Sequence, residues 1–257
     1  DIDGATWANT GDNLNITKIF AINEDGSILH ISNYASHSNG DFAGRLTVEK
    51  YTTAGVAGGE WVELGQDIIG SGYGDLLGSH VAISSDGSII AATAKQHDGN
   101  GDLSGLMRIY KYSNSDMTTG GTWTQIGQDI VGIADERWGS LSCLMSKDGN
   151  KVIFSSWTNP GAHMRLYQYS NSDMTAGGTW EQLGDTYSES SDGIFFSCDS
   201  SANTVSYTIP SHANDTSRSI SKILTYSSGT WTQKGQELNE GWSLLEGPKL
   251  SLSLIHI

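Results

Sequence analysis

The residues best suited to hold a metal ion lie in the glycine-rich segment 94–105. Within it, Asp98, Asn100 and Asp102 alternate with glycines. Side-chain oxygens therefore recur at every second position, as they do in calcium-binding loops. The distal glutamate that completes such loops is missing. The segment predicts either a calcium site, the one cofactor we consider, or a polar glycine-rich turn.

Histidine and cysteine offer weaker candidates for metal binding. Imidazole is a common metal ligand. Four histidines lie in loops of different repeats, so we expect their side chains to be solvated. They are His37, His97, His163 and His212. The two cysteines, Cys143 and Cys198, sit in apolar runs. Two cysteines cannot form a disulfide scaffold or a four-cysteine zinc site, and we expect buried free thiols.

Aromatic residues in polar loops form a second group of candidate ligand-binding residues. Such rings could stack on sugars or contact a protein partner. The alternative is that they fill space between neighbouring elements of the fold. Trp138, in the charged run ADERWG, is the best candidate for exposure. The group comprises Trp7, Tyr73, Trp138, Trp157 and Trp242, with Tyr187 at a comparable place.

Signals for catalysis are weak, and we predict no catalytic residues. Arg45, Arg108 and Arg165 recur at nearby places in three similar phrases, which favours structural ion pairs. Their expected partners are the aspartates of Asp-Gly turns or the linker aspartates Asp67 and Asp129. Serine is abundant, so a Ser-His-Asp set stays an open alternative, although no G-x-S-x-G elbow is present.

The composition excludes several classes of partner. The chain has 257 residues, with 14 Lys and Arg against 29 Asp and Glu, a formal net charge of −15. Such a field repels phosphate backbones, so we expect no nucleic-acid partner. No apolar run reaches the roughly 18 residues of a membrane-spanning helix, and no signal peptide is visible. The acidic, Lys-poor, Gly-rich composition favours a secreted or cell-surface setting.

Internal repeats determine the expected architecture. WVELGQDIIG, WTQIGQDIVG, WEQLGDTYS and WTQKGQEL begin with Trp61, Trp123, Trp180 and Trp231. Between them, Asp-Gly pairs at 25–26, 86–87 and 148–149 predict hairpins with type I′ turns, in which both central residues have positive φ. Each repeat thus contains four short strands, named a, b, c and d. In the second repeat they lie near 80–84, 88–94, 106–112 and 123–127.

Four-stranded antiparallel sheets repeated at this period are typical of an all-β fold, the β-propeller. We expect one propeller domain over 1–257, with units near 1–70, 71–132, 133–187 and 188–238 and a partial unit 239–257. It is interpreted as part of a larger propeller; a closed four- or five-bladed ring is the alternative. The recurrent tryptophans should fill the wedge between adjacent blades. Because the strands alternate in direction, the d–a and b–c loops should share one face.

The second unit resembles an FG-GAP-type repeat, the kind found in integrin α-subunit propellers and in microbial and algal surface proteins. The resemblance rests on Asp75 and Gly78 before strand a, the Asp-Gly hairpin, and the phrase G-x-x-R-I-Y-K-Y at 105–112. Leu77 stands where the family has Phe, and the D-x-D-x-D-G calcium loop is absent from the a–b turn. The resemblance implies a propeller fold but says little about activity.

Three functions follow as hypotheses. The first is a non-catalytic extracellular or cell-surface adhesion module, which binds a glycan or protein partner through the d–a/b–c loop face. The second is a propeller-fold polysaccharide hydrolase or lyase. The third is a purely structural repeat segment of a larger surface protein, which would have no exposed aromatic site.

Overall fold

The computed structural model describes residues 18–37, 42–53, 59–136, 142–157, 161–189, 195–209 and 219–240. In these residues the chain forms β-strands and no helix, so the all-β prediction is confirmed. No candidate for a membrane-spanning helix exists in this part of the chain. The strands form four antiparallel sheets in sequence order.

Each sheet contains strands a to d followed by a short fifth strand that pairs with the beginning of strand c. The first comprises β1 (Lys18–Ile22), β2 (Ile28–Asn33), β3 (Arg45–Thr52), β4 (Glu60–Glu63) and β5 (Ile68–Ile69). The second comprises β6 (Leu77–Ile83), β7 (Ile89–Ala94), β8 (Leu106–Tyr112), β9 (Trp123–Gln125) and β10 (Ile130–Val131). The third comprises β11 (Ser142–Met145), β12 (Lys151–Trp157), β13 (Ala162–Tyr169), β14 (Trp180–Gln182) and β15 (Tyr187–Glu189). The fourth comprises β16 (Phe195–Cys198), β17 (Thr204–Ile209), β18 (Ser219–Ser227), β19 (Thr230–Gln233) and β20 (Leu238–Glu240).

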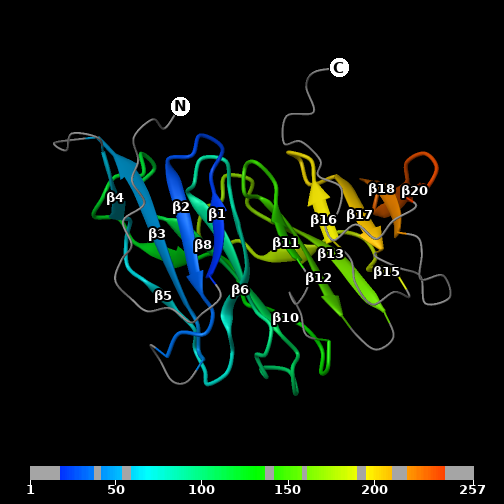
Figure 1. The fold of residues 1–257 in the computed structure, drawn as a ribbon, viewed down its shortest axis with the longest axis horizontal. Helices are drawn as coiled ribbons and strands as arrows, with labels where there is room; N and C mark the ends of the chain where they lie inside the picture. The colour runs from blue at the N-terminus through cyan, green and yellow to red at the C-terminus, as the bar shows by residue number, and fades with distance from the viewer. Residues whose placement is uncertain are drawn as a thin grey trace.

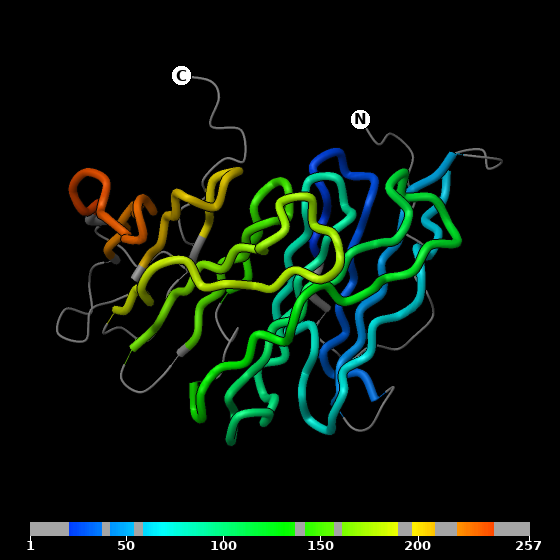
Figure 2. Tube along the Cα trace, turned by 180° about the vertical axis from the view of Figure 1, so that it is seen from behind, coloured from blue at the N-terminus to red at the C-terminus, as the bar shows by residue number. Residues whose placement is uncertain are grey.

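The four sheets are arranged as an arc, with the a strands innermost. Strand β6 contacts β1 and β11, and β11 contacts β16. The first and fourth sheets lie at opposite ends of the molecule (Figures 1 and 2) and share no extensive contact within the described residues. These sheets therefore form a propeller-like arc and not a closed four-bladed ring. The a–b turns lie at the top of Figure 1, and the b–c and d–a loops at the bottom.

The a–b turns differ from the predicted type I′ geometry. Only the glycine of each Asp-Gly pair has a positive φ, for example 80° at Gly87. The Gly87 amide donates to Ser84 O at 3.0 Å, and the Ser84 hydroxyl donates to Asp86 at 2.6 Å. The Ile89 amide in turn donates to Ser84 Oγ at 3.0 Å. This is a longer turn in which a left-handed glycine ends the bend, so the type I′ prediction was wrong.

Backbone hydrogen bonds join the a–b turns of neighbouring sheets. Glu24 N donates to Ser85 O at 3.1 Å, and Ser85 N donates to Lys147 O at 2.9 Å. Lys147 N then donates to Ser200 O at 2.7 Å. Each turn therefore uses its amide toward the next sheet and its carbonyl toward the previous one. We call this series the turn ladder.

The repeated tryptophans join each sheet to the one before it. Trp180 is 2% exposed, and its indole Nε1 donates to Ile126 O of the second sheet at 3.0 Å. The Gln128 side chain accepts from Trp180 N at 3.0 Å and donates to Trp180 O at 2.8 Å. A Cβ on Gly127 would lie 2.6 Å from the indole, so only glycine leaves room for the ring. We call this Gly-Gln pair the tryptophan socket.

The same contact joins the second sheet to the first. Trp123 Nε1 donates to Leu64 O at 2.7 Å, and the Gln66 side chain makes two hydrogen bonds to the Trp123 backbone. At the junction of the third and fourth sheets, Asp185 replaces this glutamine, and Trp231 is only half-buried. The tryptophan contact at that junction therefore lacks the glutamine bridge that the other two have.

The two cysteines fill the core, as expected. Cys143 and Cys198 are both free and 7% exposed. Burial raises the pKa of each thiol to about 12. Neither side chain is therefore a reactive thiolate at neutral pH.

Truncation of a socketed tryptophan should destabilise the protein strongly. We expect Trp180→Ala to lower the free energy of unfolding by about 3–5 kcal/mol, because it leaves a cavity between two sheets. Trp231→Ala should cost less, since Trp231 is half-buried and has no glutamine bridge. Urea unfolding followed by intrinsic fluorescence measures both. Equal losses for the two variants would contradict this account.

A buried histidine should make the fold sensitive to acid. His30 in β2 is 0% exposed, and neither ring nitrogen has a hydrogen-bond partner among the described residues. Burial lowers its pKa to about 4, from 6.5. The unfolded chain therefore binds a proton more readily between pH 6.5 and 4, so stability falls as the pH falls through this window. The full loss amounts to about 3 kcal/mol.

We expect His30→Leu to flatten that part of the stability profile. The measurement is the urea midpoint at a series of pH values from 7 to 4, for the parent and the variant. A parent profile with no decrease between pH 6.5 and 4 would show that His30 is not a buried neutral imidazole.

Candidate functional site

The b–c and d–a loops interlock on one face of the arc. Leu76 N, in a d–a loop, donates to Phe42 O of the preceding b–c loop at 3.0 Å. Asp135 N donates to Asp102 O at 2.8 Å at the next junction. Phe42, Leu76, Leu103 and Asp135 all have positive φ, between 52° and 63°. Such left-handed non-glycine residues cost free energy and often mark functional loops.

The same loops expose large apolar side chains. Tyr73 is 77% exposed, Ile133 61%, Phe42 45% and Ile69 41%. Single exposed apolar residues are ordinary, but their gathering on one face is informative. Few such residues are exposed elsewhere in the described part of the chain; two that are, Ile22 and Leu238, lie on other surfaces. Four of the six large apolar side chains that are exposed in the described residues therefore belong to this face.

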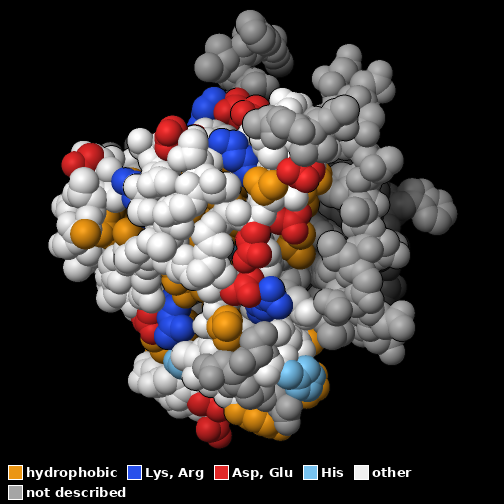
Figure 3. Space-filling model, turned by 90° about the vertical axis from the view of Figure 1, so that its left-hand side faces the viewer, with side chains coloured by type: hydrophobic (Ala, Val, Ile, Leu, Met, Phe, Trp, Pro, Cys, Tyr) orange, Lys and Arg blue, Asp and Glu red, His pale blue; other side chains and the backbone are white. Residues whose placement is uncertain are grey.

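Aromatic and basic side chains meet at the junction of the first two sheets. The rings of His37 and Phe42 lie 4.8 Å apart, and Lys95 Nζ lies 5.8 Å from the centre of the Tyr34 ring. Tyr73 is exposed on the d–a loop between the same two sheets, and Leu76 of that loop bonds to Phe42 through its backbone. We call the following five residues the aromatic junction: Tyr34, His37, Phe42, Tyr73 and Lys95. Figure 3 shows hydrophobic and histidine side chains together at the lower end of the molecule.

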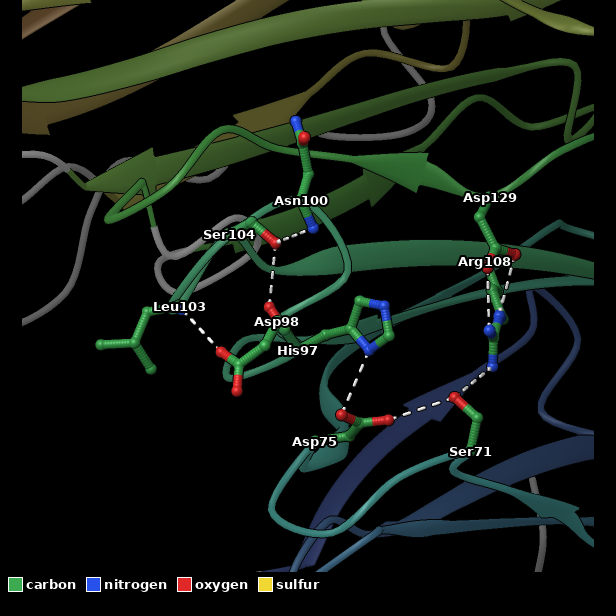
Figure 4. A network of polar contacts seen from close by, with 9 residues as sticks. All are labelled: Ser71, Asp75, His97, Asp98, Asn100, Leu103, Ser104, Arg108 and Asp129. Carbon is green, nitrogen blue, oxygen red and sulfur yellow. Dashed lines mark hydrogen bonds and ion pairs between the residues drawn. The ribbon is translucent and has the colours of Figure 1, made fainter.

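A polar network supports this junction from inside (Figure 4). Ser71 Oγ donates to Asp75 at 3.1 Å, and His97 Nδ1 lies 3.1 Å from the other Asp75 oxygen. Arg108 donates to Ser71 at 3.2 Å and pairs with Asp129 through two short hydrogen bonds. Asp75 is 6% exposed. The loop carrying Tyr73 is thus anchored by a set of part-buried polar contacts.

The network does not have the geometry of a nucleophilic triad. In such a site the histidine contacts the serine hydroxyl and takes its proton. Here Ser71 and His97 contact separate oxygens of Asp75, and Ser71 also accepts a hydrogen bond from Arg108. His97 was expected to be solvated, but its side chain is only 20% exposed because it pairs with Asp75. The arrangement holds loops in place.

The recurrent arginines are part of a repeated pairing of strand c with the linker after strand d. Arg45 pairs with Asp67 at 2.7 Å and Arg108 pairs with Asp129 at 2.8 Å. These linker aspartates were among the partners that the sequence predicted. Hydrogen bonds from the Arg108 guanidinium lower the pKa of Asp129. Arg165 differs, because Thr186 stands at the linker position; it contacts Thr186 at 3.1 Å and Glu136 at 2.5 Å.

The same pairing between strand c and the linker after strand d occurs at one position in all four sheets. Thr47, Arg108, Arg165 and Lys222 occupy one position of strand c, and each contacts the residue six places after the repeated tryptophan. The pairs are Thr47–Asp67, Arg108–Asp129, Arg165–Thr186 and Lys222–Glu237. The chemistry changes while the contact is kept, which indicates a structural role.

A carboxylate from the d–a segment joins this pairing at the third and fourth sheets. Glu136 is 1% exposed and contacts Arg165. Glu189 Oε1 accepts from Lys222 at 2.8 Å, Tyr187 at 2.5 Å and Tyr207 at 2.6 Å. Burial alone would raise the pKa of Glu189, but these hydrogen bonds lower it. Tyr187, expected among rim aromatics, is instead a half-buried member of this network, and burial raises its pKa to about 12.

Two of the candidate calcium ligands make hydrogen bonds to protein groups, Asp98 within its own loop and Asn100 to the d–a segment that follows the second sheet. Asp98 Oδ1 accepts from Leu103 N at 2.7 Å, and Asn100 Nδ2 donates to Gly132 O at 3.0 Å. Asp102 is exposed. No cluster of three His, Cys, Asp or Glu side chains suited to a metal occurs among the described residues. Calcium binding stays a prediction for this loop.

The predicted aromatic residues are only partly within the described chain. Tyr73 is exposed in its loop. Trp157 ends β12, where its backbone pairs with Ala162. Trp7, Trp138 and Trp242 lie outside the described residues, as does His212. The sequence analysis did not name Phe42 and Ile133 as candidate binding residues. Each is a large apolar residue in a polar segment that contains glycine, and this feature could have identified both.

Comparisons with known proteins identify the fold alone. No family model matches the chain, and no curated protein matches it. Similar solved structures include a candidate 6-phosphogluconolactonase from Bacteroides uniformis, 13% identical over 85% of this chain and 53% of that chain. The Dos1 propeller is 12% identical over 93% of this chain and 51% of that one. Both TM-scores are 0.53. This chain thus spans about half the length of each.

The calcium prediction can be tested directly. If Asp98, Asn100 and Asp102 hold calcium, the thermal midpoint should rise by several degrees when calcium replaces EDTA, because the ion binds the folded state. The rise should disappear in Asp98→Ala. An unchanged midpoint for the parent chain would remove calcium from this loop.

Proposed function

We propose that this chain is a non-catalytic binding module of the FG-GAP type, which acts outside the cell or at its surface. Its d–a/b–c loop face binds a glycan or a protein partner. The proposal is carried by one observation: Phe42, Tyr73 and Ile133 are exposed on loops that share this face. A purely structural repeat segment would have no reason to gather apolar side chains there.

The aromatic junction suits such a ligand. Tyr and Phe rings offer flat apolar surfaces for a sugar or a protein side chain. His37 and Lys95 add polar groups at the edge of the same surface. The Asp75 network fixes the loop behind Tyr73, so little conformational entropy is lost on binding.

The hypothesis of a polysaccharide hydrolase or lyase has less support than the hypothesis of a binding module. Glycoside cleavage needs a pair of carboxyl groups that face the substrate. In the described chain the most buried carboxylates of this face, Asp75 and Glu136, contact His97 and Arg165 instead. The binding module remains the function that the arrangement supports best.

Loss of the exposed rings should abolish binding without unfolding the protein. We expect Tyr73→Ala and Phe42→Ser each to weaken binding at least tenfold, because exposed aromatic residues supply much of the affinity at such surfaces. A glycan array and a pull-down from extracellular extracts identify the ligand, and calorimetry measures the change in affinity.

Ile22→Ser provides the matched control. Ile22 is 51% exposed, similar to Phe42, but it lies at the end of strand a on the opposite side of the arc. Binding that survives Tyr73→Ala and Phe42→Ser together, or that is lost in Ile22→Ser, would show that the ligand does not occupy the aromatic junction.

A further inference from the structure

A cavity of about 260 Å³ lies at the inner edge of the first three sheets, on the side of the a–b turns. In each of these sheets it is lined by the last residue of strand a and by the next two residues. The lining residues are Ile22, Asn23 and Glu24, then Ile83, Ser84 and Ser85, and then Met145, Ser146 and Lys147. The a–b turns are at the top of Figure 1, on the side opposite to the aromatic junction. The cavity is therefore separate from the face to which the proposed function assigns its ligand.

The first residue of each set is apolar. Ile22, Ile83 and Met145 end β1, β6 and β11. Met145 is 6% exposed, whereas Ile22 is 51% exposed. A ligand with an aliphatic part would cover Ile22 and remove its apolar area from water.

The middle residue of each set is occupied by its own turn. The hydroxyls of Ser84 and Ser146 each donate at 2.6 Å to the aspartate two positions later. Asn23 Oδ1 accepts from the Ile28 amide at 2.8 Å. All three side chains are buried. Polar recognition of a ligand therefore falls to the third residue of each set.

The third residues bring opposite charges and a hydroxyl to the cavity. Lys147 Nζ, from the third sheet, lies 2.7 Å from Glu24 Oε2 of the first sheet. Their side chains are 51% and 49% exposed, so this ion pair contributes little to stability. The Ser85 hydroxyl makes no hydrogen bond to a described residue, because only the backbone of Ser85 takes part in the turn ladder. An ammonium group, a carboxylate and a hydroxyl thus border an apolar surface.

Charge and size select the class of ligand. A ligand with only a negative group would pair with Lys147 and leave Glu24 without a partner, and a ligand with only a positive group would do the reverse. A zwitterion keeps both residues paired, so no charge loses water without compensation. The cavity volume of about 260 Å³ lies below the roughly 300–1,000 Å³ of pockets for drug-sized molecules. The ligand is therefore a small zwitterion with an aliphatic part.

We propose that this cavity binds a free α-amino acid with an aliphatic side chain, such as leucine. The α-carboxylate accepts hydrogen bonds from the Lys147 ammonium group and the Ser85 hydroxyl, and the α-ammonium group donates to Glu24. The aliphatic side chain covers the three apolar residues of the cavity. The ion pair between Lys147 and Glu24 is thus exchanged for two ion pairs with the ligand. This second binding site does not depend on the proposed function.

Calorimetric titration of the 257-residue chain with L-leucine tests the proposal. Two matched ligands are leucinamide, which lacks the carboxylate, and isocaproate, which lacks the ammonium group. Each should bind at least tenfold more weakly than leucine, because each leaves one member of the Glu24–Lys147 pair without a partner. Glycine should also bind at least tenfold more weakly, since it has no side chain to cover the apolar residues. No binding of leucine at millimolar concentration, or equal binding of leucine and isocaproate, would overturn the proposal.

Variants of the two charged residues locate the site. Lys147→Met and Glu24→Gln should each weaken leucine binding at least tenfold, because each removes a charge-assisted hydrogen bond to the ligand. Lys234→Met is the matched control, since Lys234 is an exposed lysine of the fourth sheet, and it should leave the affinity unchanged. Urea unfolding of each variant shows that the fold is kept. Leucine affinity that survives both cavity substitutions, or that falls equally in Lys234→Met, would place the ligand elsewhere and overturn the proposal.

A pair of variants separates this site from the aromatic junction. Ile22→Ser should weaken leucine binding and leave the ligand of the aromatic junction bound, whereas Tyr73→Ala should do the opposite. The two sites have no residue in common, so either assignment can fail without the other. Leucine binding that is lost in Tyr73→Ala and kept in Ile22→Ser would exclude the cavity as its site.

Discussion

The structure depends on one constraint: a four-stranded sheet with two apolar faces is stable only when another sheet covers each face. The contact that meets this constraint combines an indole between sheets with a glutamine that holds the backbone of the same tryptophan. The indole removes apolar area from water, and the glutamine satisfies polar groups that this packing would leave buried. Where Asp185 replaces the glutamine, Trp231 is less buried than Trp123 and Trp180. Burial of the indole and the presence of the glutamine thus go together.

The architecture could be predicted from sequence because its signals recur. Tryptophan-led phrases and Asp-Gly pairs mark the same elements in successive repeats, and the described strands follow them. The turn geometry was not predictable from the Asp-Gly pair alone, because Ser84 and its counterparts lengthen the bend. In the fourth repeat Asp199 and Ser201 stand where the second and third repeats have Ser and Asp. The serine still donates to the aspartate, with the two residues in exchanged positions.

The candidate site was less predictable than the fold. The exposure of Tyr73 agrees with a loop aromatic, but burial of His97 depends on Asp75, which lies in a different loop. Phe42 comes from a b–c loop, and its backbone bond to Leu76 joins it to the d–a loop that carries Tyr73. Contacts between loops of different length carry no periodic signal, so spacing along the chain does not reveal them.

The direction of the turn ladder has a consequence for how such proteins change in length. At each of the three described junctions a turn of one sheet donates its amide to the carbonyl of the turn in the next sheet. Duplication of a whole unit at any boundary would preserve the match on both sides of the insertion. Arrays of this design can therefore gain or lose units during evolution without a compensating change elsewhere.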